Sequence, residues 1–122
     1  MKKTISVSLI AVTLLFGCAE KKYGGFTVSG KVSNGGSQKI YLQELPFAGS
    51  EPLILDSATL QENGRFELRA TALEEGLYRL SLERGPEVLL INDEKSIRVN
   101  IDVNQPKNYE IEASDASKSL QT

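Results

Sequence analysis

The chain has 122 residues with no histidine, no tryptophan and one cysteine, and its 14 basic and 16 acidic side chains give a formal net charge of −2. Histidine is the commonest general base and the commonest metal ligand, so its absence excludes Ser-His-Asp triads, Cys-His dyads and ordinary zinc sites. The basic residues are scattered along the chain, which predicts that the protein does not bind nucleic acid. No motif indicates a cofactor.

The N-terminus has the three regions of a secretory signal. The basic pair Lys2-Lys3 is followed by an apolar stretch from Ile5 to Phe16 and then by the small residue Gly17. The apolar stretch is shorter than the roughly 20 residues that a membrane-spanning helix needs. We therefore expect a signal peptide over residues 1–17.

The lone cysteine follows this signal directly. The sequence Leu-Phe-Gly-Cys resembles a bacterial lipobox, which predicts cleavage between Gly17 and Cys18 and attachment of lipid to the Cys18 sulfur. The alternative is an ordinary secreted protein whose cysteine lies near the cleavage site by chance. Ala19 is not the aspartate that retains lipoproteins at the inner membrane, so the outer membrane is the favoured location, and the sequence leaves open whether the domain faces the periplasm or the surface.

From Phe26 onwards the chain alternates apolar and polar residues, as a half-buried strand does. The segment FTVSGKVS is followed by the turn-forming NGGS and by KIYLQEL, so Val28 to Leu45 reads as a β-hairpin. The segments LILDSATL and RFELRA flank Asn63-Gly64 and predict a second hairpin.

The second half of the domain repeats this pattern. The segments GLYRLSLE and EVLLI flank Arg84-Gly85-Pro86 and predict a third hairpin. Strands are also expected over SIRVNIDV, from Ser96 to Val103, and over NYEIEA, from Asn108 to Ala113. Seven to eight short strands without a helical period predict an all-β fold, an antiparallel β-sandwich over residues 26–113. A partly open β-barrel is the alternative.

The flanking segments complete the expected domain organisation. Residues 18–25 would form the acylated tether, and the polar, small residues of 114–122 are typical of a linker or tail. The longest irregular connection, LPFAGSEP, carries Phe47, which is a candidate for contacting a partner protein. Aromatic residues are more often buried than functional, so a cap on one end of the sandwich is the better interpretation of Phe47.

Three other groups have residue types that occur in chemical sites. Ser57 beside Asp56 could serve as a nucleophile, but no glycine elbow accompanies it, and a strand residue is the better interpretation. The pair Glu74-Glu75 reads as a solvated turn and not as glycosidase acids. The segment from Asn92 to Lys95 lacks the spacing of a calcium loop and reads as a hairpin turn. We therefore expect no catalytic, metal or cofactor site.

Several segments, taken in order, resemble a known family. VSGKV, KIYLQEL, LILDSATLQENGRFELRA, GLYRLSL, LLINDEKSIRVNID and ASDASKSL are similar to the domain of unknown function 4369, a β-rich module of Gram-negative envelope lipoproteins. The resemblance implies a module that precedes a thioredoxin-like domain of the thiol-disulfide interchange type. This sequence lacks the Trp-Cys-x-x-Cys site of that second domain, so no redox role passes to any of its residues.

Two functions follow as expectations. The first is a non-catalytic, membrane-anchored envelope lipoprotein that binds or docks a protein. The second is the anchoring part of a truncated or split thiol-disulfide oxidoreductase, with a separate thioredoxin-like protein as its partner. In both, the membrane is reached through the lipid on Cys18.

Overall fold

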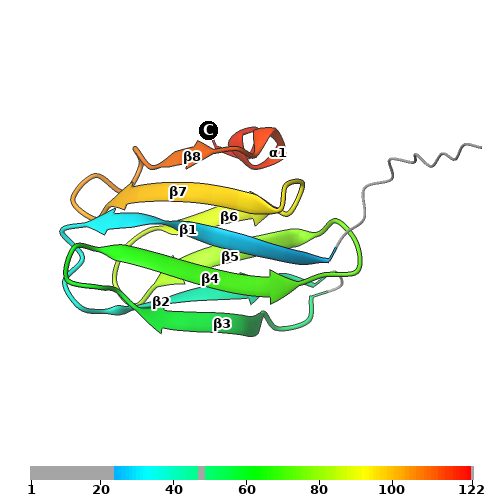
Figure 1. The fold of residues 1–122 in the computed structure, drawn as a ribbon, viewed down its shortest axis with the longest axis horizontal. Coiled ribbons are helices and arrows are strands. Elements are labelled where there is room, and N and C mark those ends of the chain that lie inside the picture. The colour runs from blue at the N-terminus through cyan, green and yellow to red at the C-terminus, as the bar shows by residue number, and fades with distance from the viewer. Residues whose placement is uncertain (1–23, 47–48, 122) are drawn as a thin grey trace, which may run out of the picture.

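The computed structural model describes residues 24–46 and 49–121. They form eight strands and one short helix, in two facing sheets (Figure 1). The elements are β1 (Gly25–Ser33), β2 (Lys39–Glu44), β3 (Leu53–Thr59), β4 (Arg65–Thr71), β5 (Leu77–Leu82), β6 (Glu87–Ile91), β7 (Ser96–Asp102), β8 (Glu110–Glu112) and α1 (Asp115–Lys118).

The sheets have the strand orders β4-β1-β7-β8 and β3-β2-β5-β6. The predicted β-sandwich is therefore confirmed, and the two separate sheets are not the barrel of the alternative. One pairing departs from the antiparallel prediction, because β1 and β7 run parallel, with Val28 opposite Ile97 and Val32 opposite Ile101. The alternation of a strand fixes which side chains face inward, but it does not fix the direction of the neighbouring strand.

Two of the three predicted hairpins are wrong. Strands β1 and β2 lie in different sheets, and so do β3 and β4. Each connection instead crosses from one sheet to the other. The β5–β6 hairpin is confirmed, with Leu77 opposite Ile91 and Leu80 opposite Val88. The segment from Asn92 to Lys95 is also a crossing between sheets and not a hairpin turn.

Buried residues in the crossings explain this topology. Leu60, just after β3, is 4% exposed, and Gln38, just before β2, is 5% exposed. The Gln38 amide donates to the carbonyl oxygens of Gly35 (3.0 Å) and Arg84 (2.9 Å) and accepts from the Arg84 N–H (2.6 Å). A hairpin turn leaves such groups in water, whereas a crossing closes the end of the core with them.

The core lies between the sheets and is filled by the inward sides of all eight strands. Phe26 and Tyr78 meet edge to face across it, with ring centroids 5.0 Å apart. The buried apolar residues are Phe26, Val28, Val32, Ile40, Leu42, Leu60, Phe66, Leu68, Ala72, Tyr78, Leu80, Leu82, Val88, Leu90, Ile97, Val99, Ile101 and Ile111. Position 30, among these residues, requires a glycine, because a Cβ there would stand 1.8 Å from the Val99 carbonyl oxygen.

The neighbouring edges of β3 and β4 are joined by one carboxylate. Asp56 accepts hydrogen bonds from the backbone N–H groups of Ser57 and Arg69, each at 2.8 Å. At the start of β4, the Arg65 N–H donates to the Asn63 side chain at 3.1 Å. Edge N–H groups that are satisfied in this way cannot pair with another chain, so these contacts protect the sandwich against edge-to-edge association.

The C-terminal residues differ from the polar linker or tail that their composition suggested. Ser114 and Ser117 are fully buried, and α1 packs beside β6 and β8 (Figure 1). The Ser114 side chain caps the helix by accepting from the Ser117 N–H at 3.1 Å. Residues 114–121 are thus part of the folded domain.

Candidate functional site

The residues that the sequence nominated most strongly, Gly17, Cys18 and Phe47, lie outside the described residues. Ser57 lies on the outer side of β3, opposite Tyr41. It is exposed, and its N–H is bound by the Asp56 carboxylate at 2.8 Å. This geometry agrees with the interpretation of Ser57 as an ordinary strand residue.

The acidic pair and the Asn92–Lys95 segment meet at the same end of the sandwich. Asn92 is 4% exposed, and its side chain accepts from the Gly76 N–H (2.8 Å) and donates to the Glu74 carbonyl oxygen (3.2 Å). The buried amide therefore fixes the β4–β5 connection. In residues 24–46 and 49–121, no group of three or more His, Cys, Asp or Glu side chains could hold a metal ion.

A polar cluster that the sequence analysis missed joins α1 to β6. The Ser114 hydroxyl donates to Asp93 Oδ1 at 2.5 Å, and the Ala116 N–H donates to Asp93 Oδ2 at 3.1 Å. The Ser117 Oγ lies 2.6 Å from the Ser114 Oγ and accepts from the Ile91 N–H at 2.8 Å. The signal was present as Ser-Asp-x-Ser, in which the first serine suits a helix N-cap.

This cluster has the residue types of a nucleophilic site but the geometry of a structural lock. Both hydroxyls are fully buried, so no dissolved substrate reaches them while α1 stays in place. Each serine instead satisfies backbone or carboxylate groups that burial would otherwise leave without a partner. The cluster therefore closes the β6 edge at Ile91.

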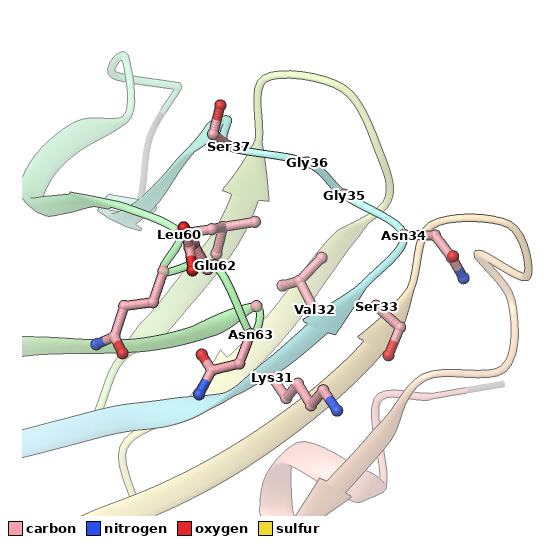
Figure 2. Close-up of a pocket in the computed structure, with 12 residues that line it drawn as sticks. Lys31, Val32, Ser33, Asn34, Gly35, Gly36, Ser37, Leu60, Glu62 and Asn63 are labelled. Carbon is pink, nitrogen blue, oxygen red and sulfur yellow. The ribbon is translucent and has the colours of Figure 1, made fainter.

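A depression of about 500 Å³ lies at the opposite end of the sandwich, between the β1–β2 and β3–β4 crossings (Figure 2). Two of its polar side chains are engaged in hydrogen bonds with neighbouring parts of the fold. The Asn34 side chain, which points away from Leu60 in Figure 2, donates to Asp102 Oδ1 at 2.8 Å, and Asn63 accepts from the Arg65 N–H at 3.1 Å. These two asparagines therefore hold the surrounding loops in place.

The outer faces of the two sheets differ in chemistry. Across the β4-β1-β7-β8 sheet, one row of paired residues runs Glu67, Ser29, Arg98 and Glu112. Arg98 Nη1 lies 3.6 Å from Glu112 Oε1. Glu67 binds the Arg69 guanidinium through Nε (3.2 Å) and Nη2 (2.8 Å), and this hydrogen bond, with its charge, raises the pKa of Arg69. This face is polar and charged.

The corresponding row of the other sheet runs Ile54, Gln43, Arg79 and Leu89. Ile54 is 55% exposed and Leu89 is 37% exposed. Between them, Arg79 Nε donates to Gln43 Oε1 at 2.9 Å, which holds the Arg79 stem along the sheet. Together with the half-buried Tyr41 in the next row, these residues make an outer face with accessible apolar groups, and we call these five residues the docking face.

No helix among the described residues is long and apolar enough to cross a membrane.

Comparison with protein-family models agrees with the family resemblance of the sequence segments. A search of curated proteins found no match. The family model described as "Domain of unknown function (DUF4369)" matches residues 26–120, which include all eight strands from Phe26 onwards and the docked α1. The chain therefore belongs to the DUF4369 family.

Proposed function

We propose that this chain is a non-catalytic docking module that a lipid on Cys18 anchors in the bacterial cell envelope. The anchor is supported by the signal-like residues 1–17 and by the small-residue-cysteine junction that follows. Two or more acyl chains on one cysteine give stable attachment, where a single chain gives only marginal binding.

The docking role is supported by the contrast between the two outer faces. A charged face such as the one carrying Glu67 and Arg98 is well solvated. Ile54 and Leu89 are exposed, and their burial by a partner lowers the free energy of the complex. The Gln43–Arg79 pair adds hydrogen-bonding groups that can give such contact specificity. Accessible apolar groups with fixed polar groups between them are typical of a protein-binding surface.

The anchor is tested by intact mass spectrometry of the chain extracted from membranes. The expected mass is that of the chain from Cys18 onwards with acyl groups, and a Cys18→Ser variant should lose both the added mass and the membrane association. An unmodified mature chain in the membrane fraction would refute the anchor.

The docking face is tested by a photo-crosslinking amino acid placed at position 89 of the full chain in intact cells. A control places it at Arg98, which is also exposed but lies on the charged face. A defined crosslinked band at 89 and none at 98 supports docking, and equal crosslinking at both positions contradicts it.

The same experiment distinguishes simple docking from the second function, which the family resemblance implies. If the module anchors a thioredoxin-like reductase that is encoded separately, the protein crosslinked at 89 carries a Cys-x-x-Cys motif. A partner without that motif leaves the docking proposal in place and removes the split-reductase alternative.

A further inference from the structure

The described chain begins at one end of the sandwich. The Gly24 carbonyl oxygen accepts from the Ala72 N–H at 3.1 Å, and Gly25 pairs with Thr71. Residue 24 therefore lies beside the β4–β5 connection. Cys18 and Gly24 are six positions apart, and six residues span at most about 20 Å in any conformation. A lipid on Cys18 would keep this end of the domain near the bilayer.

Four leucines surround this same end, and we call Leu45, Leu53, Leu73 and Leu77 the apolar rim. Leu73 is 94% exposed, Leu53 is 56% exposed and Leu77 is 37% exposed. The Leu45 N–H donates to the Leu77 carbonyl oxygen at 3.0 Å, so these two residues are neighbours. A depression of about 560 Å³ is lined in part by Leu45, Leu73 and Leu77.

A buried side chain fixes the connection that carries Leu73. The Asn92 side chain binds Gly76 and Glu74 on the β4–β5 connection, which carries Leu73. These bonds fix the backbone of the connection on the C-terminal side of Leu73. The opposite end of the sandwich differs, since its β3–β4 crossing presents exposed Gln61, Glu62 and Asn63.

We propose that the apolar rim lies against the lipid surface to which Cys18 is attached, so that the sandwich stands on its β4–β5 end. This inference rests on the proposed lipid anchor. A short tether raises the local concentration of the rim at the bilayer to roughly the millimolar range. Leucine side chains that would bind a membrane only weakly from solution are then sufficient for contact.

The charges around the rim favour lipid over a second copy of the chain. Glu44, which pairs with Leu53, lies beside it, as does Glu74, and Glu51 precedes Leu53. In a symmetric dimer built on the rim, both copies would bring this set of carboxylates into one interface, where like charges repel. A zwitterionic bilayer carries no such net charge, whereas an anionic bilayer does, so contact should weaken as anionic lipid is added.

The test uses the acylated full chain in phosphatidylcholine vesicles whose acyl chains are brominated. Cys18 is the only cysteine, and acylation blocks it, so a Leu73→Cys substitution creates one free thiol for a bimane label. A matched Glu62→Cys variant carries the same label at the opposite end. Both sites are exposed, so neither substitution removes core packing.

We expect bromolipid to quench the label at position 73 several-fold more strongly than the label at position 62. Quenching at position 73 should fall when anionic phosphatidylglycerol replaces part of the phosphatidylcholine. Equal quenching at both positions overturns the proposal. So does a label at 73 that is shielded from aqueous iodide but not quenched by bromolipid, since a protein would then cover the rim. Intact mass of each sample reports acylation separately, so a failed anchor is distinguishable from a failed rim contact.

Discussion

Replacing Ser117 with alanine should release α1 from the β6 edge. The Ser117 hydroxyl is fully buried and accepts the Ile91 N–H at 2.8 Å. Its removal leaves a partly buried N–H without its partner, which costs about 1–3 kcal/mol of unfolding free energy. The helix has only four residues, so it cannot persist once its packing against β6 is weakened.

Two measurements check this expectation. Urea unfolding should show a lower midpoint for Ser117→Ala, and native-state hydrogen exchange should show faster exchange at the Ile91 amide. The matched control is Ser119→Ala, because the Ser119 hydroxyl is exposed and only donates to the Asp115 carbonyl oxygen of the same helix at 3.1 Å. That control should change stability by less than about 0.5 kcal/mol. Unchanged exchange at Ile91, or equal losses in both variants, would refute the proposed lock.

Three further predictions concern the sandwich itself. Asp56→Ala should lose about 1–3 kcal/mol of stability, because two backbone N–H groups lose their 2.8 Å carboxylate acceptor, and light scattering should show self-association through the freed edge. Gly30→Ala should cost about 3 kcal/mol or more in urea unfolding, since a Cβ would stand 1.8 Å from the Val99 carbonyl oxygen. Burial, and to a lesser extent the Glu44 carboxylate, raises the pKa of Tyr78. The tyrosine therefore keeps its proton in the folded state at a pH where the unfolded chain has lost it. The free energy of unfolding should fall as pH rises above about 10.

Each of these has a control. Asp115→Ala removes a fully exposed carboxylate and should leave stability and association unchanged. Gly25→Ala lies in the same strand with open space around its Cβ, so a loss equal to that of Gly30→Ala would contradict the steric argument. Tyr78→Phe should flatten the alkaline loss of stability, and an unchanged slope would assign that loss to other groups.

The sequence predicted the faces of the strands better than their partners. In β7, the alternation of Ile97, Val99 and Ile101 placed all three side chains in the core, as the structure confirms. The same alternation is compatible with a hairpin and with a crossing between sheets, and Asn63-Gly64 suits either connection. The deciding residues were Leu60 and Gln38, whose burial depends on contacts with distant parts of the chain.

The candidate site shows the same limit. The segment that contains Ser114 and Ser117 reads as a tail because serine is usually exposed. In the fold, β6 offers the Ile91 N–H and carbonyl oxygen, and the Asp93 side chain offers a carboxylate, so buried hydroxyls find partners. Such a match between polar groups 20 or more positions apart has no signature in local composition.

The central position of β1 has a mechanical consequence. β1 is hydrogen-bonded to β4 on one side and to β7 on the other, and the chain enters it directly after Gly24. A pulling force applied through the N-terminal residues acts along the axis of β1, so it loads both ladders in shear. An edge strand would instead be peeled away one hydrogen bond at a time. The strand nearest to the N-terminal attachment is thus among those best placed to resist extraction from the sandwich.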